Sequence, residues 1–166
     1  MSIKSPFLYF VALIISGVFT VSFPQQMNAK LKQLTTGSDI IITGKVAKQK
    51  SSWNSNKTRI YTEATVQVDQ YLKGNDRSNT VVVTYPGGEV GGVGELYTHM
   101  PKFSNDEDVL VFLKKDKRSN SYDVFDGENG KINIIKDAKT GQKVTSSNVR
   151  IDYIKSQIES ILQNKK

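Results

Sequence analysis

The side chains that carry most enzyme chemistry are scarce in this chain. Its 166 residues include no cysteine and a single histidine, His99. Thiol nucleophiles, disulfide bridges and cysteine-based zinc sites are therefore excluded. A lone histidine needs a neighbouring nucleophile or an orienting carboxylate before it can act as a base, and no serine stands in a GxSxG or SxxK motif. We therefore expect a protein without catalytic activity, bound metal or cofactor.

The acidic residues form two turn clusters rather than a metal site. One cluster, residues 106–108 (DED), precedes an apolar segment, and the other lies within residues 123–128 around a glycine-containing turn. The second cluster could offer oxygen ligands to Ca²⁺, but it lacks the DxDxDG order of a calcium loop. Asp is common in turns because its side chain hydrogen-bonds nearby backbone, and this accounts for both clusters.

The most distinctive segment is residues 86–95, PGGEVGGVGE, which holds five of the 12 glycines in the chain. The phosphate-binding motifs GxxxxGK[ST] and GxGxxG are both absent, and two glutamates would repel a phosphate. Two interpretations stay open: a wide structural loop whose backbone needs positive φ, or a recognition loop that continues to Phe103. The recognition interpretation gives these partner-binding candidates, the last from a separate polar loop: Glu89, Glu95, Tyr97, His99, Met100, Phe103 and Trp53.

The elements that must position these residues read mainly as strands. Residues 58–72 alternate strictly, with Ala64, Val66 and Val68 on one face, which is typical of a long strand with one solvated face. The apolar runs 80–85 and 108–113 indicate buried central strands. Further strands are expected at 39–50, 122–125 and 131–135, with a polar loop at 51–57 and a hairpin turn at 127–130.

The last segment reads as an amphipathic helix. Isoleucines recur at helical spacing over residues 149–163, behind a cap formed by Ser147 and Asn148. Six strands with tight connections and one terminal helix predict a mainly β fold, either a small barrel or a β-sandwich. The expected organisation is a leader over residues 1–29, a barrel domain over 30–146 and a C-terminal helix over 147–166.

The amino-terminal segment reads as an export signal. Lys4 supplies a basic start, an uncharged apolar run extends to Phe23, and Ala29 is a suitable residue at a cleavage edge. The run also reaches the ~17-residue lower limit of a spanning helix, so an uncleaved membrane anchor is the alternative. Both interpretations place the rest of the chain outside the cytoplasm.

Several segments together resemble a known group of proteins. They are DIIITGKV, VDQYLKG, TVVVTYPGG and DEDVLVFLKK, of which Tyr71–Gly74 is the most recognisable piece. Over roughly residues 38–135 the chain resembles small exported prokaryotic proteins without assigned activity. Its layout is distantly similar to netrin-type modules and tissue inhibitors of metalloproteinases. The resemblance implies an OB-type five-stranded barrel. Those inhibitors chelate the zinc of their target through an amino-terminal cysteine, which this chain lacks, so their mechanism is not carried over.

The remaining observations concern partners. The net charge is +7, but the lysines are dispersed, which suits a solvated surface attracted to anionic envelope polymers. Asn56 begins the glycosylation sequon Asn56-Lys57-Thr58.

We expect a non-catalytic extracytoplasmic module that binds a protein or an envelope polymer. The alternatives are an enzyme inhibitor acting through the glycine-rich loop and a polyanion-binding or nucleic-acid-binding barrel. Contact with a membrane is expected only through the leader, if it is not cleaved.

Overall fold

The computed structural model describes residues 23–164. Strands make up 45% of the chain and helices 20%, so the predicted mainly β class is confirmed. The apolar part of the predicted leader, up to residue 22, lies outside the described residues. None of the helices within residues 23–164 is long and apolar enough to cross a membrane.

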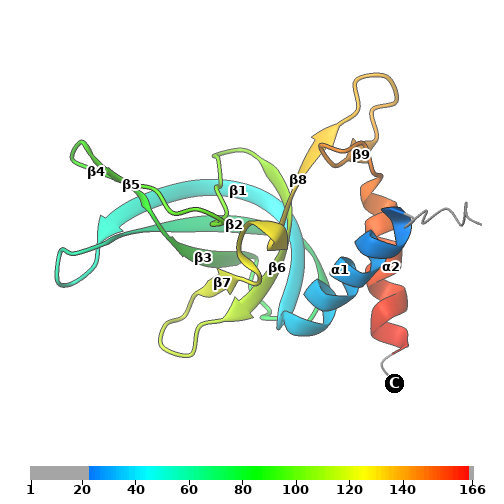
Figure 1. Cartoon of the computed structure of the whole chain (residues 1–166), viewed down its shortest axis with the longest axis horizontal. Coiled ribbons are helices and arrows are strands. Elements are labelled where there is room, and N and C mark those ends of the chain that lie inside the picture. The colour runs from blue at the N-terminus through cyan, green and yellow to red at the C-terminus, as the bar shows by residue number, and fades with distance from the viewer. Residues whose placement is uncertain (1–22, 165–166) are drawn as a thin grey trace, which may run out of the picture.

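The centre of the molecule is a closed barrel of five strands (Figure 1). The strands follow one another in the order β1-β2-β3-β7-β6, and β6 pairs back with β1. Only β3 and β7 pair in parallel. This is the strand order of an OB-like barrel, so the structure favours the predicted barrel over a sandwich. The bounds are β1 (Ile40–Trp53), β2 (Ile60–Lys73), β3 (Thr80–Pro86), β6 (Asp108–Lys115) and β7 (Tyr122–Val124).

The long alternating segment is β2, and its apolar face points into the barrel as predicted. Ala64 and Val66 are fully buried there, and Val68 packs at the edge of the same cluster. They share one buried cluster with Ile40, Ile42 and Val46 of the neighbouring strand β1.

Strands β1 and β6 have apolar residues in succession because both of their faces are covered. Ile42 and Val111 point into the barrel, whereas Ile41, Leu110 and Phe112 belong to a second buried cluster outside it. Two helices cover that outer face, namely α1 (Phe23–Gly37) and α2 (Ile151–Gln163). The helices lie at one end of the barrel (Figure 1).

Helix α1 was not predicted, and it runs through the expected cleavage edge after Ala29. Leu31 and Leu34, in the second half of the helix, are buried in the cluster outside the barrel. Lys73 donates from Nζ to the carbonyl oxygens of Thr35, Thr36 and Ser38. A cation at the last turn satisfies carbonyl groups that have no partner within the helix and complements the helix dipole. This lysine therefore fixes the end of α1 against β2.

The start of α2 differs from the prediction. The helix begins at Ile151, and its N-cap is Arg150, which makes no side-chain capping hydrogen bond. Ser147 and Asn148 lie in the preceding turn instead, where the Asn148 amide donates to the Thr145 carbonyl. The isoleucine spacing still located the helix, because Ile151, Ile154 and Ile158 are buried against the barrel.

The predicted hairpin over residues 122–135 is wrong. Strands β7 and β8 (Lys131–Lys136) do not pair with each other; both pair antiparallel with β6, one after the other along its length. The GENG segment forms a single 3-10 turn, η1 (Gly127–Gly130), so the chain bulges out and resumes its direction. A short strand that was not predicted, β9 (Lys143–Val144), follows and pairs with β8.

The glycine-rich segment is a small hairpin rather than a wide loop. Its strands, β4 (Gly88–Val90) and β5 (Val93–Glu95), form a separate two-stranded sheet that projects from the barrel end away from the helices (Figure 1). The polar loop predicted at residues 51–57 is also shorter than expected. Ser51, Ser52 and Trp53 belong to β1, and Trp53 pairs with Ile60 of β2.

Candidate functional site

The shape of the β4–β5 hairpin depends on its glycines. Gly91 and Gly92 form the turn with φ values of +60° and +79°, and positive φ at both central residues is the requirement of a type I′ turn. Gly88 is needed for a different reason: a Cβ there would overlap the hydroxyl groups of Ser51 and Thr62. The hairpin therefore lies directly over the ends of β1 and β2.

Hydrogen bonds attach this hairpin to β2. The Gly87 amide donates to the Ile60 carbonyl at 2.8 Å, and Thr62 Oγ1 donates to the Gly87 carbonyl at 2.6 Å. Glu95 Oε2 accepts from the Ile60 amide at 3.0 Å and from the Tyr97 hydroxyl at 3.1 Å. Because two donors already occupy this carboxylate oxygen, Glu95 primarily holds the hairpin in place.

The irregular segment 96–107 lies opposite the hairpin, and the buried side chain of Lys131 holds it in place. Lys131 Nζ contacts Glu107 Oε1 at 2.8 Å and donates to the Lys102 carbonyl at 2.6 Å. It also lies 4.9 Å from the centre of the Phe103 ring. The side chain of Lys131 is only 6% exposed, so its charge depends on these partners. Lys131 thereby fixes the position of the whole segment.

Between the hairpin and segment 96–107 lies an open cleft of about 540 Å³. Its floor is Tyr85, whose ring packs 5.5 Å from the Phe103 ring and whose hydroxyl donates to Gln49 Oε1 at 2.9 Å. Burial raises the pKa of Tyr85 above its ordinary value. Leu96, at the rim, is 77% exposed. The cleft is therefore mostly apolar with a few polar groups at its base, a composition typical of binding sites.

The structure brings together most of the residues predicted to contact a partner. Those that line the cleft are Glu89, Glu95, Tyr97, Met100 and Phe103. Phe103 is buried, so it packs the cleft from beneath rather than presenting a surface.

Two of the predicted residues lie elsewhere. His99 is exposed with φ +61°, and its carbonyl accepts from the Glu128 amide, so it ties this segment to η1 instead. Trp53 lies half-buried at the end of β1, outside the cleft lining.

Other lining residues were missed by sequence reasoning. Gln49, Ser51 and Thr62 come from β1 and β2, and Tyr85 comes from β3. No local pattern distinguishes them, because each is an ordinary strand residue that becomes part of a cleft only when the hairpin folds over the strand ends.

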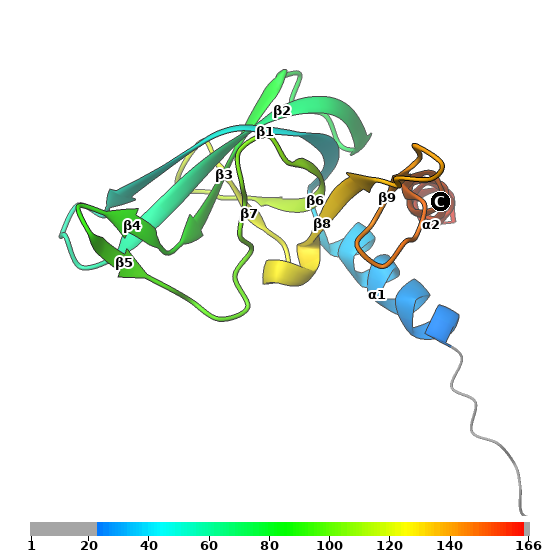
Figure 2. The ribbon, with the colours of Figure 1, turned by 90° about the horizontal axis from the view of Figure 1, so that it is seen from above.

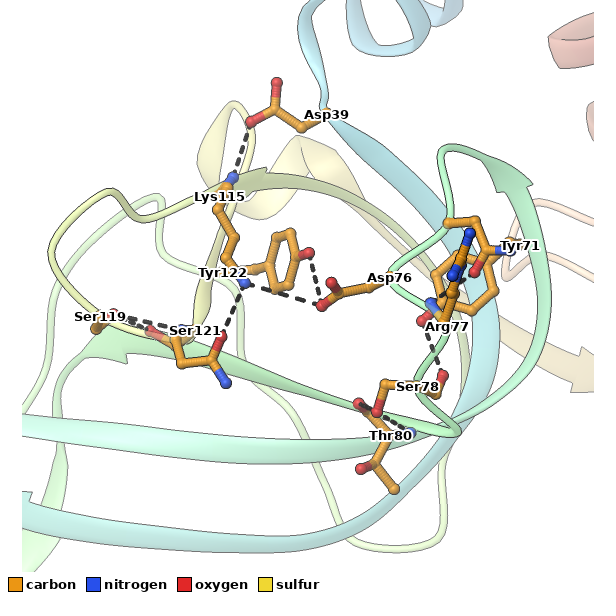
Figure 3. Close-up of polar contacts among 12 residues, drawn as sticks. Asp39, Tyr71, Asp76, Arg77, Ser78, Thr80, Lys115, Ser119, Ser121 and Tyr122 are labelled. Carbon is orange, nitrogen blue, oxygen red and sulfur yellow. Dashed lines mark hydrogen bonds and ion pairs between the residues drawn. The ribbon is translucent and has the colours of Figure 1, made fainter.

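A second polar cluster lies at a different part of the barrel (Figure 3). The Tyr122 hydroxyl donates to Asp76 Oδ2 at 3.0 Å, and Lys115 Nζ lies 3.8 Å from the same oxygen. Burial, followed by the hydrogen bond to Asp76, raises the pKa of Tyr122 to about 12. These contacts join the β2–β3 connection, which carries Asp76, to the ends of β6 and β7.

Two remaining predictions concern metal ions and glycosylation. Across residues 23–164, no three histidine or acidic side chains lie together in a way that could hold a metal ion. Asn56 is exposed in the turn between β1 and β2, and Lys57 beside it has φ +53°. The sequon is therefore on the surface.

Comparison with known proteins finds no family model and no curated protein that matches this chain. The resemblance to netrin-type modules therefore stays a prediction.

Proposed function

We propose that this chain is a non-catalytic binding module that works outside the cytoplasm and holds a partner protein in the cleft beside the β4–β5 hairpin. The observation that carries the proposal is the cleft of about 540 Å³, between a hairpin and a segment that are each fixed by specific hydrogen bonds. A pre-formed, largely apolar recess of this kind is typical of ligand sites, and the lone histidine, His99, lies outside its lining. The lining carries two carboxylates, Glu89 and Glu95, against one cation, Lys102, and this balance disfavours a polyanion as the occupant.

The exposed rim gives a direct test of the cleft. A photo-crosslinking amino acid at Leu96 should capture a discrete partner in cells, because that side chain is 77% exposed beside the recess. The matched control is Ile135, which is 50% exposed on β8 and lines no cleft. Crosslinked species are expected from position 96 and absent from position 135, as read on gels after irradiation. Equal labelling from both positions would contradict a specific cleft partner.

The compartment is tested separately. Cell fractionation and intact mass measurement should place residues from about Lys30 onward outside the cytoplasmic membrane. The reason is the pattern of an export signal near the amino terminus, in which the basic residue Lys4 precedes an apolar run. A chain shortened after Ala29 would indicate cleavage, whereas a full-length membrane-bound chain would indicate an anchor. A full-length chain in the soluble cytoplasmic fraction would contradict the proposal.

A further inference from the structure

One glycine of the hairpin, Gly94, is not required by the backbone conformation, and it lies in the cleft lining. Gly87, Gly88, Gly91 and Gly92 all have positive φ, and Gly88 also has no room for a Cβ. Gly94 differs from all four. Its φ lies outside the left-handed region, and a Cβ built on it would meet nothing nearer than the Gly88 carbonyl oxygen at 3.9 Å. A side chain at this position would therefore fit without strain, yet none is present.

The backbone of Gly94 also faces outward. A type I′ turn at Gly91-Gly92 places the first hydrogen bond between Val90 and Val93. Because hydrogen-bonded and non-hydrogen-bonded pairs alternate along an antiparallel ladder, the next pair, Glu89 and Gly94, directs its N–H and C=O groups away from the hairpin. Over the described part of the chain β5 pairs with β4 alone, and Figure 2 shows β5 on the outer side of β4.

Strand β5 is only three residues long, so its exposed edge offers a single pair of outward backbone groups, at Gly94. Natural edges are commonly protected by lysine or proline, and the far half of β1 carries Lys48 and Lys50 in this way. Strand β5 has neither residue type, and apolar side chains lie at its first residue and just beyond its last. Val93 is 50% exposed, and Leu96 lies just beyond the strand.

We propose that the outer edge of β5 accepts an extended segment of the partner polypeptide as a third, antiparallel strand, with an aromatic residue opposite Gly94. The outward N–H and C=O of Gly94 match the backbone groups of such a strand, which is the known mode of strand addition. A strand glycine marks a place where another chain approaches closely, and an aromatic side chain across from it covers the bare backbone. This inference rests on the proposed function and specifies how the partner is held.

The probe is the blocked peptide Thr-Val-Thr-Phe-Thr-Val-Thr, titrated into the ¹⁵N-labelled protein and followed by NMR. Saturable binding is expected, with the largest amide shift at Gly94. The matched control is the same peptide N-methylated at phenylalanine, which removes the donor to the Gly94 carbonyl and should bind about tenfold more weakly. Equal affinity of the two peptides, or no binding of either up to about 1 mM, would overturn the proposal.

Two variants test the same edge from the protein side. Gly94→Pro removes the outward N–H without removing a bond to β4, so the melting temperature should hold while peptide binding falls at least tenfold. Gly94→Ala keeps the N–H and should fold at least as stably, with an intermediate loss of affinity. Should the proline variant fail to fold, the alanine variant and the N-methylated peptide still decide the question. Unchanged peptide affinity in Gly94→Ala, or in a folded Gly94→Pro, would count against strand addition.

The two proposals fail separately. If a partner is crosslinked specifically from Leu96 but the N-methylated and unmodified peptides bind with equal affinity, the binding cleft is supported and strand addition is rejected. Because Gly94 also lines the cleft, the backbone hydrogen bonds decide between the two sites. Peptide binding that weakens on N-methylation, without any crosslinked partner in cells, would support the open edge and reject the cleft as the site of a cellular partner.

Discussion

Replacing Val66 with aspartate is expected to unfold the protein at ordinary temperature. Val66 is fully buried in β2 and packs within the barrel interior between its strand partners Val46 and Val81. An unpaired charge there should cost several kcal/mol, which is comparable to the ~5–15 kcal/mol that stabilises a typical domain. Circular dichroism during heating measures the effect.

The control for Val66→Asp is the next residue along the strand. The side chain of Gln67 is exposed on the outer face of β2, so Gln67→Asp should change stability by at most about 0.5 kcal/mol. A Val66→Asp protein that melts at the same temperature as the Gln67→Asp protein would show that the two faces of β2 are assigned the wrong way round.

Replacing Lys131 with methionine is expected to produce the second large loss. The change leaves the Glu107 carboxylate, which is only 17% exposed, without its cation. Removing one member of a buried ion pair typically costs about 3–5 kcal/mol. Urea unfolding should show this loss, and crosslinking from Leu96 should fall because Lys131 also holds the Lys102 carbonyl in the cleft wall.

Two further variants separate the charge effect from packing. Adding Glu107→Gln removes the uncompensated charge but keeps an acceptor for the Ser104 amide, so the double variant should recover part of the stability. Lys45→Met removes a solvated pair with Asp108, whose closest atoms are 3.8 Å apart, and should cost at most about 1 kcal/mol. Equal losses in Lys131→Met and Lys45→Met would contradict the role given to Lys131.

The strands of the barrel could be predicted from the sequence where the pattern of apolar residues directly reflects which side chains are buried. The alternation in β2 identified its inward face. The apolar run 108–113 correctly indicated a strand buried on both faces, β6, whereas the run 80–85 became β3, which is buried on one face only. The pairing of β7 and β8 could not be read in the same way. Gly127 and Gly130 favour a reversal of the chain, and only the neighbouring β6, which offers both segments a partner edge, decides that the chain continues forward.

The candidate site was predictable only as a segment of the chain. Glycines and apolar residues without a strand pattern identified the region from Gly87 to Phe103, but the role of each side chain depends on contacts with distant strands. Glu95 looks like a free carboxylate in the sequence, yet it accepts the Ile60 amide. Helix α1 was missed because its apolar stripe is weak and follows directly on the leader.

The way in which the barrel closes sets the order in which the protein can fold. Strands β1, β2 and β3 form an up-and-down meander joined by short turns, so they can assemble early from neighbouring residues. Closure has to wait for distant partners: Ile40 pairs with Leu113, and Val83 pairs with Tyr122. Pairing between such distant segments slows folding. The meander is therefore expected to form first, and closure of the barrel by β6 and β7 is expected to be the slow step of folding.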